Sequence, residues 1–279
     1  MIIDLIDGTY ELFRHFYGLR RFNKGKDDPL GAVVGVLNGT LQLLENRATH
    51  VGVATDQVIE SFRNALWPGY KTGEGIEPAL RAQFRPLEES LAAMGVVVWP
   101  MHELEADDAL ASAAFLASRD PAVQKVLIWT PDKDLAQCVR GDRVVQADRR
   151  SSKIRTASDI KQKFGVAPEL IPDFLALVGD AADGYPGIKG IGAVGAARLL
   201  NEHGAIEAFA PNILGEQLGQ ALLFKRLATL RTDAELFRDS ESLRWKGPTQ
   251  SFAAWTERAH APRLLERALA VQAKLQARG

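Results

Sequence analysis

The chain begins with the stretch MIIDLIDG, residues 1–8, in which a short apolar run ends at Asp7 and Gly8. A run of this length, closed by a turn signal, is typical of a buried β-strand. We therefore predict a strand over Met1–Ile6 with an aspartate at its carboxyl end. Asp4 lies inside this strand, and the sequence leaves open whether it faces a cleft or pairs with a base.

The same pattern returns along the first half of the chain, with helical patterns between the apolar runs. Further strands are predicted at Val51–Thr55, Val96–Trp99, Lys125–Trp129 and Arg143–Gln146. Apolar residues at helical spacing predict helices over Leu30–Leu44, Ala79–Met94 and Ala106–Ser118. Strands that alternate with helices indicate an α/β fold with a doubly wound, parallel sheet.

The second half of the chain has a mostly helical pattern, from about Thr156 onward. The predicted helices are Ala157–Phe164, Pro168–Val178, Ala193–His203, Ile206–Ala210, Glu216–Leu230 and Arg263–Ala277. We therefore predict an α/β domain over residues 1–160 and a helical subdomain over residues 161–279.

Acidic residues follow four of the predicted strands close to the point where each strand ends. They are Asp7, Asp56, Glu105, Asp107, Asp108, Asp132 and Asp134. Because the carboxyl ends of parallel strands meet at one edge of a sheet, we expect these side chains to converge on one cleft. Their mutual repulsion would raise their pKa values, and divalent cations such as Mg²⁺ or Mn²⁺ would relieve it.

Each acidic group also has a simpler explanation when it is taken alone. Asp7 and Gly8 form an ordinary turn sequence, and acids near Glu105 suit the positive end of a helix dipole. Asp132 can cap the turn that follows it. None of these explanations accounts for acids at the ends of successive strands, so a metal site is the preferred interpretation.

The segment GDAADGYPGIKGIG, residues 179–192, adds two acids and a glycine-rich loop between two predicted helices. Asp180 and Asp183 are three residues apart, a spacing that lets both carboxylates reach one ion. Glycine lets backbone N–H groups approach a phosphate at the start of the next helix. An ordinary connection between two helices is the alternative, and the acids directly upstream favour a clamp on a DNA backbone.

At these motifs the chain resembles the 5′–3′ exonuclease and flap endonuclease family, which includes stand-alone bacterial members and the N-terminal nuclease domain of DNA polymerase I. The resemblance runs from Met1 to about residue 240. It rests on Ile6–Gly8 with Arg14, Thr55-Asp56, Ser61–Arg63, Pro68–Lys71, Glu105–Asp108, Thr130–Leu135 and Gly179–Gly187. It implies nine carboxylates around the metals, namely the seven given above together with Asp180 and Asp183.

The resemblance also implies details of the fold and of the metal site. The fold would be a PIN-like, doubly wound and mostly parallel sheet, with a helical arch at about residues 63–91 over the cleft. A helix-hairpin-helix (helix-three-turn-helix) motif would place its hairpin at residues 184–192. The inner metal ligands would be Asp7, Asp56, Glu105, Asp107, Asp132 and Asp134. The outer or water-mediated ligands would be Asp108, Asp180 and Asp183.

The implied reaction is hydrolysis of DNA phosphodiester bonds with two divalent ions about 3.5–4 Å apart. Mg²⁺ is the usual ion of the family, Mn²⁺ can substitute for it, and K⁺ often binds at the hairpin. Asp7 and Asp132 would act at the reaction centre, and Lys71 would stabilise charge on the scissile phosphate. A solvated surface lysine is the alternative for Lys71.

Residues expected to contact DNA lie mainly in the arch and the hairpin. They are Arg14, Arg63, Tyr70, Lys71, Arg81, Gly187, Lys189, Gly190 and Gly192. Core packing is the alternative to base stacking for Tyr70, and Arg14 could equally pair with a metal-site carboxylate. Eight basic residues between Arg140 and Lys163 form either a patch for the duplex backbone or an ordinary solvated surface.

Besides Asp4, which lies inside a strand that is normally wholly apolar in the family, two positions depart from the family pattern. A basic residue usually follows the Tyr70-Lys71 pair, and this chain has Glu74 nearby, which removes one expected phosphate contact. An asparagine usually follows the last metal aspartate, and this chain has Gly184. Neither position is one of the nine acids, so we expect activity to survive.

The composition is that of a globular protein, with 279 residues of which 46% are apolar. A single cysteine excludes an internal disulfide framework and a cysteine-rich zinc site. The longest apolar run spans about eight residues, whereas a membrane helix needs about 20, and the N-terminus lacks the pattern of a signal peptide. We expect a cytoplasmic monomer without a membrane partner, which acts alone or with a separate DNA polymerase.

The net charge of −1 at first argues against a DNA partner, because DNA-binding domains are often strongly basic. Setting nine metal-site acids aside leaves 26 of the 35 acids against 34 lysines and arginines, an excess of 8 positive charges. We predict a metal-dependent, structure-specific 5′ nuclease for DNA 5′ ends, flaps or nicks in replication and repair. The alternatives are a PIN-type ribonuclease, which generally lacks the arch and hairpin, and a non-catalytic helix-hairpin-helix DNA-binding protein, which needs no such acids.

Overall fold

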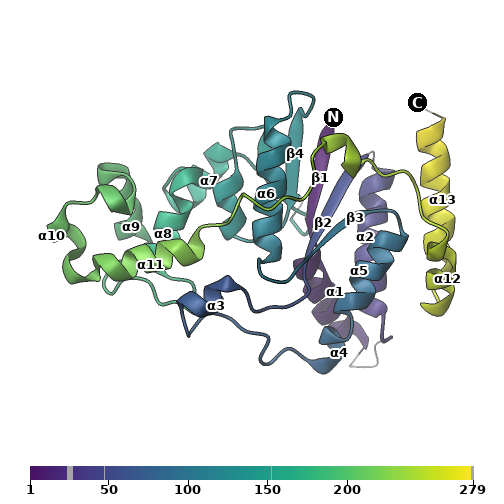
Figure 1. The fold of residues 1–279 in the computed structure, drawn as a ribbon, viewed down its shortest axis with the longest axis horizontal. Helices are drawn as coiled ribbons and strands as arrows, with labels where there is room; N and C mark the ends of the chain where they lie inside the picture. The colour runs from purple at the N-terminus through teal and green to yellow at the C-terminus, as the bar shows by residue number, and fades with distance from the viewer. Residues whose placement is uncertain (24–27, 47, 152, 278–279) are drawn as a thin grey trace.

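A six-stranded sheet forms the centre of the molecule (Figure 1). The computed structural model describes residues 1–23, 28–46, 48–151 and 153–277. The strands are β1 (Ile2–Asp7), β2 (His50–Asp56), β3 (Val97–Met101), β4 (Lys125–Trp129), β5 (Val144–Asp148) and β6 (Lys153–Arg155). Their order is β3-β2-β1-β4-β5-β6, and every neighbouring pair is parallel except β5 with β6. This confirms the predicted doubly wound, mostly parallel sheet.

The strand order reverses at β1, which pairs with β2 on one side and with β4 on the other. Asp7 lies opposite Ala54 of β2, and Ile6 lies opposite Trp129 of β4. Ligand sites form outside the carboxyl ends of the strands at such a reversal. Asp7 and the residues that follow Trp129 therefore border the expected site.

Helices cover both faces of the sheet. On one face α1 (Gly8–Asn23), α2 (Gly31–Glu45) and α5 (Phe84–Ala93) enclose a core that includes Ile6 and Val53. We call this core the sheet-side core. On the other face α6 (Ala106–Arg119) packs its alanines against Ile3 and Leu5. Successive side chains of β1 enter opposite cores because side chains alternate across a strand.

A bundle of short helices extends from one end of the sheet around a separate core. Its helices are α7 (Ala157–Phe164), α8 (Ile171–Val178), α9 (Ala193–His203), α10 (Pro211–Leu214) and α11 (Leu218–Ala228). They bury Ile171, Leu177 and Phe224, among other apolar residues. Short 3₁₀ turns lie at Asp134–Cys138, Pro168–Leu170, Ile206–Ala208, Gly215–Gln217 and Ser240–Leu243. The glycine-rich segment joins α8 to α9, as a helix-hairpin-helix arrangement requires.

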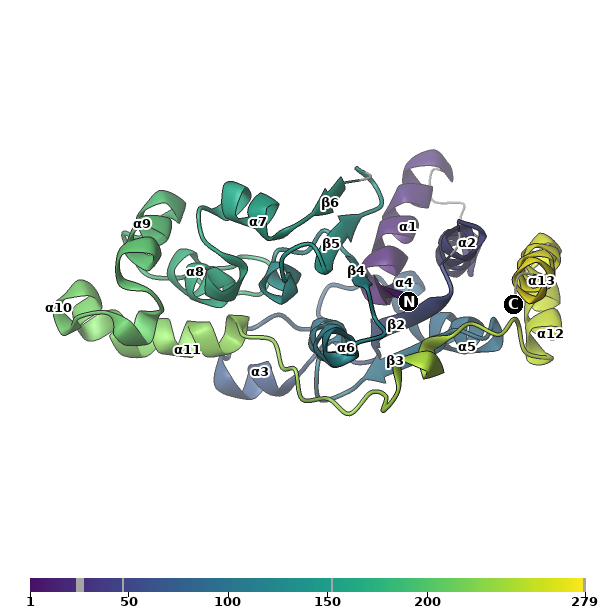
Figure 2. The same cartoon turned by 90° about the horizontal axis from the view of Figure 1, so that it is seen from above.

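The last part of the chain returns to the sheet instead of joining this bundle. α12 (Ser251–Arg258) packs against α5 and α13 (Pro262–Gln276) against α2, at the opposite end of the molecule from α8–α11 (Figures 1 and 2). Trp245 and Phe252 are buried in the sheet-side core, and Trp245 Nε1 donates to Met94 O at 2.8 Å. Residues 245–276 therefore lie apart from the helical subdomain expected over residues 161–279, because their apolar side chains are buried against the sheet.

The segment expected to form the arch also divides between two environments. One helix was predicted over Ala79–Met94, but the structure has α4 (Pro78–Arg81) and α5, separated at Gln83. The Gln83 side chain is buried and accepts a hydrogen bond from Val33 N at 3.3 Å. Leu80 of α4 belongs to the same core as Phe84 and Leu87 of α5. α3 (Phe62–Leu66) packs beside α11 and buries Arg63, so the segment is anchored at both ends and the loop between α3 and α4 joins them.

Among the described residues, four helices and one strand were not predicted from the sequence. They are α1, α3, α10, α12 and the antiparallel strand β6. α1 starts at a glycine and contains Gly18, and glycine has a low helix propensity, which weakens a helical pattern. None of the helices in the described part of the chain is long and apolar enough to cross a membrane.

Candidate active site

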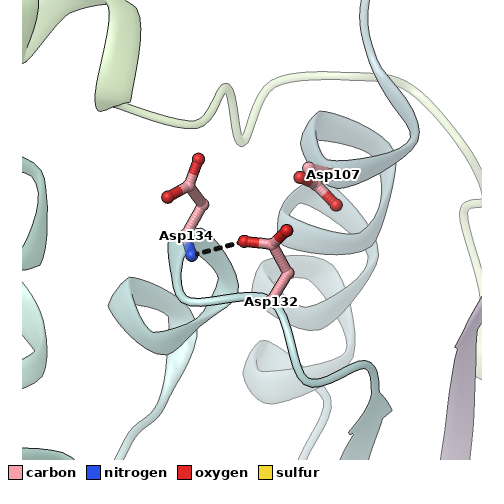
Figure 3. Close-up of side chains that lie close together, drawn as sticks. All are labelled: Asp107, Asp132 and Asp134. Carbon is pink, nitrogen blue, oxygen red and sulfur yellow. Dashed lines mark hydrogen bonds between the residues drawn. The ribbon is translucent and has the colours of Figure 1, made fainter. Parts of the chain in front are cut away.

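Acidic side chains from the start of α6, from the segment after β4 and from the loop after α8 gather at the carboxyl edge of the sheet. One carboxylate oxygen from each of Asp107, Asp132 and Asp134 lies within 4.8 Å of the others. Figure 3 shows Asp107 on α6, with Asp132 and Asp134 on the segment that follows β4. A second group, formed by Asp134, Asp180 and Asp183, meets the same distance limit. The two groups share Asp134, so five of the nine predicted ligands lie in two adjoining groups, each of which could hold a cation.

Asp7 and Asp56 border these groups at the ends of β1 and β2. Asp7 accepts hydrogen bonds from Tyr10 N at 2.8 Å and from Thr130 Oγ1 at 2.9 Å. Burial, together with the nearby charge of Asp56, raises the pKa of Asp7 to about 7. Asp56 accepts a hydrogen bond from Ala106 N at 2.7 Å, and burial raises its pKa as well. The backbone of α6 thus orients one of the two carboxylates.

The uncompensated negative charge is greatest at Asp107 and Asp134. Burial, and after it the charge of Asp132, raises the pKa of both carboxyl groups well above the usual value. Asp134 is 7% exposed, and its Oδ1 is buried without a hydrogen-bond partner among the described residues. A buried carboxylate oxygen without a partner is costly, and a cation would satisfy it. The all-carboxylate donor set therefore fits a hard divalent cation such as Mg²⁺ or Mn²⁺.

A tight loop after α8 presents Asp180 and Asp183 to the cluster. Asp180 N donates to Tyr185 O at 2.8 Å, which closes the loop. Lys133 Nζ lies 2.6 Å from Asp180 Oδ2 and so joins this loop to the segment after β4. The Tyr185 hydroxyl is buried beside the same acids, without a partner among the described residues. Sequence reasoning missed both Lys133 and Tyr185, although Lys133 lies between two predicted ligands.

Lys71 reaches the cluster from the arch. Its Nζ lies 2.8 Å from Glu105 Oε2 and 3.0 Å from Asp183 Oδ1, and the side chain is 33% exposed. Burial opposes the charge of Lys71, but the two carboxylates outweigh it and raise the pKa of Lys71 well above the usual value. Lys71 is therefore held as a cation by two carboxylates at the edge of the acidic cluster, and the structure does not place it as a solvated surface lysine.

Asp108 and Arg63 form a buried ion pair behind the cluster. Arg63 is 1% exposed, and its two terminal nitrogens each lie 2.7 Å from an oxygen of Asp108. Asp108 also accepts hydrogen bonds from Glu105 N at 3.0 Å and from Arg231 N at 2.9 Å. Four donors occupy the Asp108 carboxylate, and Asp108 belongs to neither of the two acidic groups, although we expected it among the outer ligands. Arg63 is buried and not exposed for the DNA contact that we expected of it.

Glu105 links this ion pair to Lys71 at the edge of the acidic cluster. Arg63 Nη1 donates to Glu105 Oε1 at 2.9 Å, and Ser61 Oγ donates to the same oxygen at 2.7 Å. Burial opposes ionisation of Glu105, but Lys71 and Arg63 prevail and lower its pKa. Glu105 is thus held as an anion whose partners come from the arch.

Two further residues expected at the DNA are held within the protein. Tyr70 is 4% exposed and packs in the core of the helical bundle, with its hydroxyl 3.4 Å from Glu105 Oε2. Base stacking by Tyr70 is therefore excluded in this conformation, and core packing is found. Arg14 pairs with Glu11 at 2.6 Å, which is not one of the nine acids.

The remaining predicted DNA contacts lie on the surface. Arg81 and Lys189 are exposed, and so are Gly190 and Gly192, whereas Gly187 is buried. Gly187 has φ of +72°, and a Cβ atom there would lie 2.4 Å from Gly179 N, so only glycine fits the turn. The hairpin thus presents exposed backbone at the start of α9.

Asp4 and the basic stretch after Arg140 have mixed environments. Asp4 is 5% exposed and accepts a hydrogen bond from Trp129 Nε1 at 2.8 Å, so it faces the sheet-side core and not the cleft. Arg149 is partly buried beside Trp129, with its guanidinium 5.6 Å from the ring centre. The exposed basic residues of the stretch are Arg140, Arg143, Arg150, Lys153, Lys161 and Lys163.

Comparison with known proteins shows similarity over most of the chain. Residues 3–165 match the family model described as 5′-3′ exonuclease, N-terminal resolvase-like domain. Residues 166–251 match the model described as 5′-3′ exonuclease, C-terminal SAM fold.

The chain is 30% identical over 256 residues to a 5′-3′ exonuclease of Aquifex aeolicus, an alignment that covers 88% of this chain and 86% of the relative. It is 36% identical over 252 residues to DNA polymerase I of Pseudomonas aeruginosa, covering 83% of this chain but only 27% of that polymerase. A solved structure of T5 5′-exonuclease with divalent zinc ions bound has the same fold, with a TM-score of 0.66 at 19% identity and coverage of 97% and 98%.

Proposed function

Because the chain belongs to the 5′-3′ exonuclease family, we propose that it hydrolyses DNA phosphodiester bonds at 5′ ends, flaps or nicks with the help of divalent metal ions. The observation that carries this proposal is the pair of acidic groups that share Asp134. Two adjoining carboxylate groups are what a two-metal phosphodiesterase requires. The role would belong to DNA replication and repair, in keeping with the polymerase I relatives.

The metals we propose are two Mg²⁺ ions, with Mn²⁺ as a substitute. One would be held by Asp107, Asp132 and Asp134, and the other by Asp134, Asp180 and Asp183. Bound divalent ions supply a nucleophile at neutral pH, neutralise the phosphoryl oxygens and stabilise the leaving oxygen. Asp7 and Asp56 would complete the first of these sites, since their charges act on each other and, from Asp7, on Asp107.

The chain itself would supply positioning and electrostatic stabilisation. Thr130 and the backbone of Tyr10 hold the Asp7 carboxylate, and Lys133 holds Asp180. Lys71 is a fixed cation at the rim, so its ammonium can exchange a carboxylate for a phosphoryl oxygen on which charge develops.

The duplex would be held away from the reaction centre by the hairpin at residues 184–192. Lys189 and the exposed backbone of Gly190 and Gly192 suit phosphate contacts at the start of α9, and a K⁺ ion is proposed there. Arg81 on the arch and the exposed basic residues after Arg140 would add salt-sensitive affinity for the backbone. We also propose a monomer that works in the cytoplasm beside a separate polymerase.

The experiment is a cleavage assay with purified protein, Mg²⁺ and 5′-labelled substrates of matched sequence. We expect cleavage of a 5′ flap and of a nicked duplex, and the ratio of products defines the preferred structure. A single-stranded RNA of the same sequence tests the PIN-type ribonuclease alternative, which faster RNA cleavage would establish. Binding of DNA without any cleavage would instead establish a non-catalytic DNA-binding protein.

A further inference from the structure

The start of the arch is bonded directly to the loop that carries two metal ligands. We define the arch foot as residues 67–71. Trp67 Nε1 donates to Gly184 O at 3.0 Å, and Lys71 N donates to Asp183 O at 3.0 Å. Both bonds bridge segments more than 100 residues apart in the chain, so together they fix the foot against the loop.

Gly184 allows this close approach in a way that no other residue could. Its φ is +84°, a conformation that L side chains rarely adopt. A Cβ atom on Gly184 would lie 1.9 Å from the carbonyl oxygen of Gly69 in the arch foot. The glycine at this position, where the resemblance led us to expect asparagine, is therefore explained by the contact with the foot.

The arch foot also contacts α11 and α3. The Trp67 ring meets Phe224 of α11 edge to face, with ring centres 5.3 Å apart. Asn64 Nδ2 of α3 donates to Lys71 O at 3.0 Å. The backbone of Lys71 is thus bonded through both its N–H and its carbonyl group, which leaves little freedom to the start of its side chain.

We propose that Trp67 and Gly184 are positioning residues that hold Lys71 over the metal cluster, an inference that rests on the proposed nuclease function. The bonded foot sets the place from which the Lys71 side chain reaches both Glu105 and Asp183. Small displacements of a catalytic group lower reaction rates strongly while they leave substrate affinity nearly unchanged. Trp67 therefore acts on the rate through Lys71 and does not itself contact the scissile phosphate.

The test compares Trp67→Phe with Trp245→Phe. The first keeps a ring against Phe224 but removes the N–H donor to Gly184 O. The second removes the same kind of bond, from an indole N–H to Met94 O, on the far side of the sheet. In metal-free protein, hydrogen exchange of residues 67–77 should become faster in Trp67→Phe and stay unchanged in Trp245→Phe.

The kinetic arm uses a 5′-flap substrate under single-turnover conditions. Trp67→Phe should lower the rate at saturating DNA about tenfold with the dissociation constant within about threefold of wild type. In a Lys71→Ala background, Trp67→Phe should have almost no further effect, because the residue through which it acts is missing. Gly184→Ala, which forces the foot away, should reproduce both the faster exchange and the slower rate.

Wild-type exchange in Trp67→Phe would overturn the proposal, and so would an undiminished rate loss in the Lys71→Ala background. If wild-type protein fails to cleave DNA, the proposed function is refuted instead. The exchange comparison then still decides whether Trp67 holds the foot, because it needs neither metal nor substrate.

Discussion

Arg63, which we expected to contact DNA, is buried and joins three elements of the protein. It joins α3 to Asp108 and Glu105 of the α6 start, and its Nε donates to Leu227 O at 2.8 Å. We predict that Arg63→Met lowers the free energy of unfolding by about 3–5 kcal/mol, because Asp108 stays buried without its cation. Urea unfolding followed by circular dichroism measures this change.

Arg81→Met is the matched control, because Arg81 lies exposed on the same segment. Its unfolding free energy should stay within about 0.5 kcal/mol of wild type. If Arg63→Met unfolds with the wild-type free energy but binds DNA more weakly, Arg63 contacts DNA and does not stabilise the fold.

His15 on α1 predicts a dependence of stability on pH. Burial, and after it the charge of Arg14, lowers the pKa of His15 to about 4, and Arg149 acts in the same direction against Glu11. As the pH falls, His15 therefore becomes protonated near pH 6.5 in the unfolded chain but only near pH 4 in the folded protein. This contribution to stability is present above pH 6.5 and is lost as the pH falls towards 4.

The size of the effect is at most about 3 kcal/mol, and His15→Gln should remove it. Unfolding free energies of both proteins are to be compared between pH 7 and pH 4. We expect the wild-type value to fall more steeply than the variant value, and parallel curves would show that His15 is freely protonated in the folded state.

At the residue scale, the sequence predicts charged positions better than their partners. The acids of the cluster could be predicted because they follow strands whose carboxyl ends share one edge. The pairs Arg63–Asp108 and Lys133–Asp180 could not, since each joins residues from separate elements. The burial of Tyr70 could not be predicted either, because it depends on the helical bundle that packs around the ring. The sequence alone therefore allowed base stacking as well as core packing.

At the scale of elements, the strands β1 to β5 were predictable from short apolar runs. β6 was hidden, because Lys153 and Arg155 make it too polar to differ from a loop. The break between α4 and α5 was also hidden, because it depends on the contact of Gln83 with Val33 of α2. Elements that depend on tertiary partners cannot be predicted from periodicity alone.

The C-terminal helices predict a stability effect at this scale. Phe252 of α12 is fully buried in the sheet-side core, together with apolar residues of α2 and α5. Phe252→Ala should lower the free energy of unfolding by about 3–5 kcal/mol. Leu269→Ala on α13 is the control, because Leu269 is 48% exposed and should cost far less. Equal, small losses in thermal or urea unfolding would show that α12 is only loosely attached.

At the scale of the whole molecule, the net charge of −1 does not reveal that acidic side chains are concentrated at one edge of the sheet. The acids converge at the sheet edge, and exposed lysines and arginines lie on the arch, the hairpin and the stretch after Arg140. The order of the strands made the acidic cleft predictable. The position of residues 245–276 was not, because their buried face is complementary to α2 and α5 only after the sheet has formed.

The most direct test of the central claim is cleavage of a 5′-labelled flap substrate by wild-type protein and by Asp132→Ala at the same concentration. Asp132 is exposed and makes no ion pair among the described residues, although its Oδ1 accepts a hydrogen bond from Asp134 N at 2.9 Å. Its loss therefore removes a proposed metal ligand, and we expect the fold to be retained. With Mg²⁺ we expect cleavage by wild type and none by Asp132→Ala, while both unfold at similar temperatures. Absence of wild-type cleavage with both Mg²⁺ and Mn²⁺, or full activity of Asp132→Ala, would contradict the account.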